Sequence, residues 1–81
     1  MSIYDQLKKA IDGKSEAEIG RLKRKNFDTF CVTRVRSIAT ENTNLDTVTN
    51  RLIDLMQDTF LDLFDHSIAL EVAKNVANKY F

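Results

Sequence analysis

The stretch NLDTVTNRLIDLMQDTFLDLFD, residues Asn44–Asp65, is the longest regular pattern in the chain. Its apolar side chains recur every three or four residues, which is the spacing of an amphipathic helix. We therefore predict one helix over 44–65 and expect it to be the central helix of the fold. Its main apolar side consists of Leu45, Val48, Leu52, Leu55, Met56, Thr59, Phe60 and Leu63.

This stretch carries more apolar side chains than one buried face needs. Ile53, Leu61 and Phe64 fall outside the main stripe and widen the apolar arc to more than half of the circumference. A helix at the surface of a monomer needs an apolar stripe of roughly 100°. We therefore predict that these three side chains contact another protein, and that the protein self-associates as a homo-oligomer, most simply a dimer.

Acidic side chains follow the opposite side of the same predicted helix. Asp54, Asp58 and Asp62 are spaced four residues apart. Like charges at this spacing destabilise an isolated helix by about 0.2–0.5 kcal/mol per pair. A basic surface facing them, in a partner or in this chain, would offset that cost, so we predict that they guide a partner electrostatically. The simpler interpretation is a solvated face.

The remaining chain divides into further helices. Ser2 and Ser15 each precede an acidic residue by three positions, which is typical of a helix start, and Gly13 is typical of a helix end. Asn26 favours a break within 16–39, because the apolar positions before and after it lie on different sides; one continuous helix is the alternative. The predicted helices are about 2–12, 16–25, 27–39, 44–65 and 68–80.

Composition supports a single all-α domain over residues 1–81. The chain has no proline and two glycines, and its 43% apolar and 30% charged residues are typical of a folded protein. One cysteine excludes an internal disulfide, so a chain this small gains most from oligomerisation. No apolar run has the length of a membrane span, and the first residues lack the pattern of a signal peptide. We expect a cytoplasmic protein without membrane contact.

Two sets of residues have the chemistry of a reactive site. Asp58, Asp62 and His66 would share one face of a continuous helix, and Cys31 with His66 has the composition of a nucleophile and base. We interpret the first set as a solvated face and Cys31 as a core residue. Glycine-rich phosphate loops and nucleophile motifs are absent from the sequence. We therefore expect no catalytic residue, no metal, no cofactor and no enzymatic activity.

A basic cluster provides the alternative function. Four cations within five positions can neutralise several phosphates of a nucleic acid. The same cations near a helix end would also complement its dipole, by about 0.3–1 kcal/mol each. The predicted nucleic-acid-binding set is Arg21, Lys23, Arg24 and Lys25, with Arg34 and Arg36 in support.

The charge distribution separates the two halves of the chain. The net charge is zero, but residues 1–40 carry nine basic and five acidic side chains, whereas residues 41–81 carry three basic and seven acidic. Such halves attract each other on folding or present a basic face to a partner. Our leading hypothesis is a protein–protein interaction module that acts as a regulator, inhibitor or adaptor; the alternative is a nucleic-acid-binding regulator.

Overall fold

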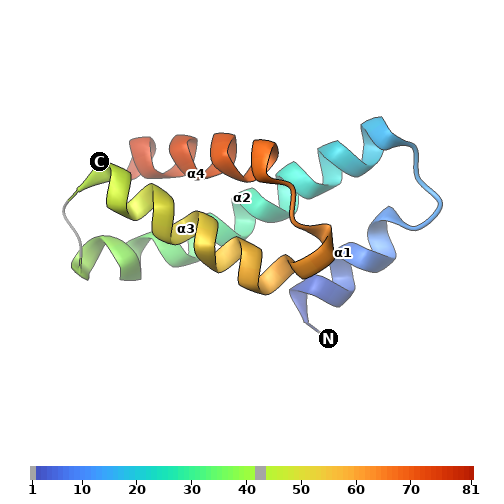
Figure 1. Cartoon of the computed structure of the whole chain (residues 1–81), viewed down its shortest axis with the longest axis horizontal. Helices are drawn as coiled ribbons and strands as arrows, with labels where there is room; N and C mark the ends of the chain where they lie inside the picture. The colour runs from blue at the N-terminus through green and yellow to red at the C-terminus, as the bar shows by residue number, and fades with distance from the viewer. Residues whose placement is uncertain (1, 42–43) are drawn as a thin grey trace.

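The computed structural model describes residues 2–41 and 44–81, and every regular element in these residues is helical (Figure 1). The prediction of a small all-α bundle is confirmed. No helix in the described ranges has both the length and the apolar character needed to cross a membrane. The elements are α1 (Ile3–Ile11), α2 (Glu16–Glu41), α3 (Leu45–Phe60), the short 3₁₀ helix η1 (Leu61–Leu63) and α4 (His66–Tyr80).

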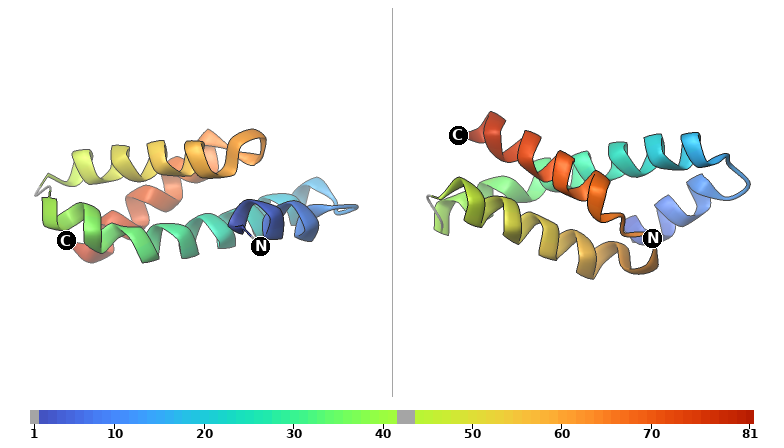
Figure 2. Two further views of the ribbon diagram at one scale, coloured as in Figure 1. Left: turned by 90° about the horizontal axis from the view of Figure 1, so that it is seen from below. Right: turned by 45° about the horizontal axis from the view of Figure 1, so that its top comes forward.

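Helix α2 forms the spine of the molecule. Its 26 residues extend over about 39 Å at 1.5 Å per residue, close to the 41 Å longest dimension. α1 folds back beside its first half, α3 runs antiparallel to it, and α4 runs parallel to it (Figures 1 and 2). All three other α-helices contact α2. The longest and central helix is therefore α2, and not the 44–65 segment that the sequence indicated.

The predicted break at Asn26 is wrong, and α2 continues through it. The Asn26 side chain does not cap a new helix; its Nδ2 donates to the carbonyl oxygen of Leu22 at 2.8 Å. The apolar positions on two sides of this helix do not require a break, because its neighbours also lie on two sides. α1 covers the beginning of α2, and α3 and α4 cover the rest. The alternative of one helix is correct.

The predicted helix over 44–65 is also wrong in its last turns. α3 ends at Phe60, and Leu61 has φ 51° and ψ −118°, a conformation that interrupts the helix. After η1, the Asp65 side chain accepts a hydrogen bond from the backbone N–H of Ile68 and caps α4. His66 is thus the first residue of α4, two positions before the predicted start near residue 68.

The helix starts and the first helix end follow the predicted local rules. Ser2 and Ser15 each accept a hydrogen bond from the backbone N–H three residues further on, at 3.1 and 3.3 Å. Asn44 caps α3, accepting from the two N–H groups of Asp46 and Thr47. Gly13 has φ +72°, the left-handed conformation that ends many helices. The sequence also allows Thr43, with Asp46 three residues further on, as the cap of α3, but Thr43 lies outside the described residues.

An aromatic cluster joins α2 to the end of α3. The ring of Phe60 lies 4.6 Å from that of Phe27 and 5.6 Å from that of Phe30, measured between centroids. Phe64, beyond η1, stacks at 6.5 Å from Phe27. Phe27 and Phe60 are fully buried. The chain reversal at residues 61–65 therefore begins immediately after a residue that is fixed in the core.

Candidate protein-binding face

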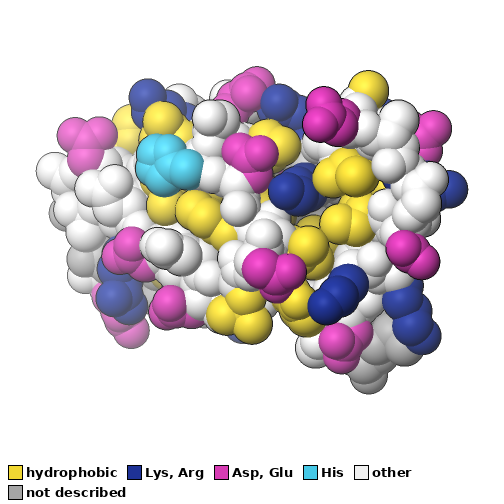
Figure 3. Space-filling model, turned by 45° about the vertical axis from the view of Figure 1, so that its right-hand side comes forward, with side chains coloured by type: hydrophobic (Ala, Val, Ile, Leu, Met, Phe, Trp, Pro, Cys, Tyr) yellow, Lys and Arg dark blue, Asp and Glu magenta, His cyan; other side chains and the backbone are white. Residues whose placement is uncertain are grey.

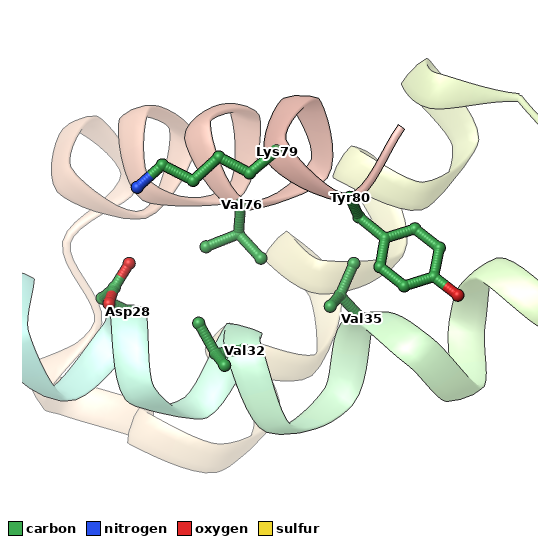
Figure 4. A pocket seen from close by; sticks show the side chains of 6 residues that line it. All are labelled: Asp28, Val32, Val35, Val76, Lys79 and Tyr80. Atoms are coloured by element: carbon green, nitrogen blue, oxygen red, sulfur yellow. The ribbon is translucent and has the colours of Figure 1, made fainter.

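A groove lies between the parallel helices α2 and α4. Val76 points from α4 toward Val32 and Val35 on α2, and Tyr80 stands at the C-terminal end of the row (Figure 4). The groove has a volume of about 250 Å³. Val32 is 56% exposed and Tyr80 is 46% exposed, so water reaches apolar surface along it. Asp28 and Lys79 complete the lining.

The helical period places these side chains together. Asp28, Val32 and Val35 are four and three residues apart, so they share one side of α2. Fully buried alanines on α4, among them Ala73 and Ala77, let this helix approach its neighbours closely. Val35 and Val76 are buried at the base of the groove, and Val32 is exposed at its edge.

The same side of the molecule becomes basic toward the start of α2. A second hollow shares Asp28 and Lys79 with the groove and is also lined by Arg21, Arg24 and Lys25. Arg24, which lines this hollow, forms an ion pair with Glu71 of α4 at 2.8 Å. We call the two hollows together the α2–α4 face: apolar near Val32 and Tyr80, and basic near Arg21.

The predicted nucleic-acid-binding set is only partly brought together. Arg21, Arg24 and Lys25 line one hollow, but Lys23 lines a different one with Glu16 and Asp65.

The two supporting arginines do not join that hollow's lining. The Arg34 guanidinium lies 5.2 Å from the ring centroid of Phe30, where it makes a cation–π contact, and Arg36 is exposed. On the face shown in Figure 3, acidic and basic side chains are interspersed among apolar patches, and neither sign covers a continuous area.

The three predicted interface residues of the 44–65 segment differ in exposure. Ile53 is only 9% exposed and belongs to the hydrophobic core, so it is not available to a partner. Phe64 is half-buried against the core, whereas Leu61 is 61% exposed. α2 and α4 both pack against α3, so the wide apolar arc is largely covered within one molecule.

The predicted acidic stripe is divided by the end of α3. Asp54 and Asp58 are exposed on α3, but Asp62 lies in η1 and accepts a hydrogen bond from the Tyr4 hydroxyl at 2.5 Å. This hydrogen bond is the main reason why the pKa of Asp62 is lowered; the positive charges of Lys8 and Lys23 also contribute. Asp62 is therefore held by α1 of the same molecule.

The groups considered for reactive chemistry are separated or buried. Asp58, Asp62 and His66 lie on α3, η1 and α4, and the described residues include no group of three or more side chains placed to hold a metal. The Cys31 thiol is fully buried and donates to the Met56 sulfur at 3.6 Å. Burial, with a smaller contribution from the charge of Asp28, raises the pKa of Cys31 to about 12, so this thiol stays protonated at neutral pH.

Sequence reasoning missed the apolar part of the α2–α4 face. Val32 is an apolar residue beside the buried stripe of α2, the same kind of position that drew attention to Ile53. The position of Val32 beside this stripe is the signal in the sequence that could have indicated an exposed apolar site. The contribution of Tyr80 depends on the parallel contact of α2 with α4, which is a tertiary feature that helical spacing does not predict.

Comparisons of the chain with protein-family models, with curated proteins and with solved structures find no match. In this small helical bundle, the α2–α4 face is apolar at one end and basic at the other.

Proposed function

We propose that this protein is a protein-binding module, a regulator, inhibitor or adaptor, that acts through its α2–α4 face. One observation carries the proposal: Val32 and Tyr80 are about half exposed along a groove between two helices. Large apolar side chains in a concave site release water when a partner covers them, at about 25 cal/mol per Å² of buried apolar area. The protein acts by binding, without catalysing a reaction.

The composition of the face supports a protein as the occupant. Interface centres are depleted in charged residues and enriched in aromatic residues, methionine and arginine, and they are surrounded by polar rims. Val32, Val76 and Tyr80 provide an apolar centre, and Asp28 and Lys79 lie at its edge. Tyrosine and arginine are also frequent among residues that dominate binding energy.

The size of a stable interface indicates that a partner covers more than the apolar groove. Standard complexes bury about 800 Å² on each partner, roughly a seventh of the 5280 Å² surface of this molecule. The apolar groove opens into the basic hollow through Asp28 and Lys79. A partner that follows the groove therefore meets the basic end as well, which provides the additional area.

A second copy of this chain is an alternative occupant of the same face. The sequence favoured a dimer because of the wide apolar arc of residues 44–65, but most of that arc is buried within the monomer. We therefore propose that the occupant is another protein. Light scattering at tens of micromolar tests this choice: a dimer that dissociates on replacing Val32 by glutamate would assign the face to a second copy of the chain.

A nucleic acid is the second candidate occupant, because Arg21, Arg24 and Lys25 line one hollow. Two observations make it the weaker one. Glu71 offsets part of the charge of Arg24, and Asp28 lies in the same lining, so the hollow presents few cations to a run of phosphates. A phosphate backbone would also leave the apolar end near Val32 uncovered, since nucleic-acid interfaces depend mainly on cations.

Affinity capture from a lysate of the native host, treated with nuclease, tests the proposal with three forms of the chain. These are the unmodified protein, Val32→Glu, and Thr47→Glu as a matched control. Both substitutions add one carboxylate at an exposed helical position, but Thr47 lies in the first turn of α3, away from the lining of the face. Circular dichroism verifies that all three are folded.

We expect one protein to be retained by the unmodified chain and by Thr47→Glu, and to be lost with Val32→Glu. Equal retention by all three forms would refute the proposed face. A parallel capture without nuclease, with Arg21→Glu and Lys25→Glu added, tests the alternative: a signal seen only without nuclease, lost in these two variants and kept in Val32→Glu, would establish nucleic-acid binding.

A further inference from the structure

We infer that the α2–α4 face binds an acidic amphipathic helix of the partner protein. This inference rests on the proposed function and specifies the partner's chemistry. The apolar groove and the basic hollow are consecutive along the same pair of helices, so one elongated segment of a partner meets both in order. The required segment carries apolar side chains at one end and carboxylates at the other.

The walls of the groove determine the secondary structure of the occupant. The described walls are α2 and α4, whose backbone hydrogen-bonding groups are used within the helices. An extended segment that binds by strand addition needs free backbone groups at a sheet edge, and helices do not provide them. Recognition here depends on side chains, which is the helix-in-groove mode with anchors at positions i, i+3 or i+4, and i+7.

The apolar end selects the anchors. Val32, Val35 and Val76 form aliphatic walls, and the Tyr80 ring stands at the end of the row (Figure 4). Side chains of this kind match leucine, isoleucine, methionine or phenylalanine, which gain from burial and need no hydrogen-bond partner in the groove. We therefore assign two apolar anchors of the partner helix, one turn apart, to this end.

The basic end sets the position of the acidic residues. Along α2, Lys25 precedes Val32 by seven residues and Arg21 precedes it by eleven, or about 10 and 16 Å at 1.5 Å per residue. Carboxylates two to three turns from the apolar anchors of a partner helix are placed to meet these cations. Arg21 and Val35 span about 21 Å of α2, so a partner helix of about 14 residues, four turns, covers the face.

The Arg24–Glu71 ion pair reduces the positive charge of the basic hollow but does not neutralise it. Both side chains of the pair are about half exposed, at 48% and 56%, so a partner carboxylate can approach the guanidinium from solvent. Exposed ion pairs contribute little individually and weaken with salt. Several such contacts give selectivity for an acidic helix, while the apolar anchors provide most of the affinity.

Fluorescence anisotropy with three synthetic 16-residue helical peptides tests the inference at low salt. The first has two leucine anchors one turn apart and three glutamates two to three turns away. The second replaces the glutamates by lysines, and the third replaces the leucines by serines. Each is titrated with the unmodified protein, Lys25→Glu, Val32→Glu and Thr47→Glu.

We expect the glutamate peptide to bind the unmodified protein and Thr47→Glu equally, and about tenfold more tightly than the lysine peptide. The serine peptide and the Val32→Glu variant abolish the signal, and Lys25→Glu reduces the preference for glutamate to about threefold or less. Equal binding of the glutamate and lysine peptides would overturn the inference, as would binding that Val32→Glu leaves unchanged.

The proposed function and the inference fail separately. If lysate capture depends on Val32 but the glutamate peptide does not bind, the partner is not an acidic helix and the proposed function stands. If capture is independent of Val32, the proposed function itself is wrong. A labelled DNA duplex that binds and displaces the glutamate peptide would overturn the inference in favour of a nucleic acid.

Discussion

Leu61 holds a backbone conformation, φ 51° and ψ −118°, that residues with a side chain rarely adopt. Such conformations cost about 1–3 kcal/mol in a residue other than glycine. The surrounding structure supplies the compensation, because Phe60 is fixed in the aromatic core just before it and Asp65 caps α4 just after it. Leucine is a strong helix former, so the sequence alone predicted continuation and not a reversal.

Replacing Leu61 by glycine should stabilise the protein. The exposed side chain contributes little burial, and glycine adopts positive φ without steric cost. We expect a gain of about 1 kcal/mol, or a rise of about 4–8 °C in Tm, measured by thermal unfolding. Leu61→Ala is the matched control: it removes the same apolar surface but keeps Cβ, so it should give no gain. Equal Tm changes in the two variants would contradict the strained backbone.

Tyr4 controls the titration of Asp62. Its hydroxyl donates to the carboxylate and also accepts a hydrogen bond from Lys8 at 3.4 Å, and these contacts lower the pKa of Asp62 and raise that of Lys8. A carboxyl group with a lowered folded-state pKa stabilises the fold above its ordinary pKa of about 3.9, and that contribution is lost as pH falls through the folded-state value.

We therefore expect Tyr4→Phe to raise the pKa of Asp62 toward its ordinary range. Carbon-13 NMR of the side-chain carboxyl carbon, followed through a pH titration, measures this value directly. Tyr80→Phe is the control: it removes a hydroxyl from an exposed tyrosine at the end of α4 and should leave the Asp62 titration unchanged. An Asp62 pKa that is the same in Tyr4→Phe and in the unmodified protein would exclude the hydrogen bond in solution.

At the scale of elements, caps were predictable and internal breaks were not. A cap depends on one side chain and the next two or three N–H groups, as at Ser2 and Asn44, so it can be identified from a few residues. The continuity of α2 and the end of α3 depend on neighbouring helices, which supply burial on two sides of α2 and anchor Phe60. Local spacing holds no information on those neighbours.

Two asparagine substitutions distinguish one α2 helix from two. Asn44 is an N-cap, so Asn44→Ala should cost about 1 kcal/mol of unfolding free energy, measured by urea denaturation. Asn26 lies inside a helix, where alanine has the higher helix propensity and the lost side-chain hydrogen bond offsets part of the gain. Asn26→Ala should therefore stay within about 0.5 kcal/mol of the unmodified protein. A cost as large as that of Asn44→Ala would indicate a cap and a second helix.

The two glycines should respond oppositely to alanine. A Cβ at Gly20, inside α2, meets nothing within 4 Å, so Gly20→Ala should stabilise the protein by about 0.5–1 kcal/mol. Gly13 also has space, but its φ of +72° is unfavourable for alanine, so Gly13→Ala should destabilise by about 1 kcal/mol. Thermal unfolding of both variants gives the signs, and a gain at Gly13 would contradict the left-handed turn after α1.

For the whole molecule, the charge asymmetry of the sequence is partly used within the fold. Arg24 forms an ion pair with Glu71, and the charge of Lys8 helps to lower the pKa of Asp62, so two basic side chains of the first half interact with acidic ones of the second. Arg21 and Lys25 of α2 help to make the α2–α4 face positive at one end.

The candidate site was predictable only in part. The sequence identified Arg21, Lys23, Arg24 and Lys25 as a group, because four cations within five positions stand out in any chain, and all of these except Lys23 line the basic hollow. It did not identify the apolar end of the face, since Val32 and Tyr80 meet only through the parallel packing of α2 and α4. The sequence also placed Ile53 at an interface, whereas this side chain is buried in the core. Helical spacing could not predict this, because the packing of α2 and α4 on α3 is a property of the assembled bundle.

The central claim, that a partner protein binds the α2–α4 face, is tested most directly by NMR mapping. The nitrogen-15-labelled chain is titrated with the purified captured protein, and the amide signals are followed residue by residue. The account predicts that the largest changes fall in α2 between Arg21 and Val35 and in α4 between Val72 and Tyr80. Changes confined to the outer side of α3, around Asp54 and Asp58, would contradict it.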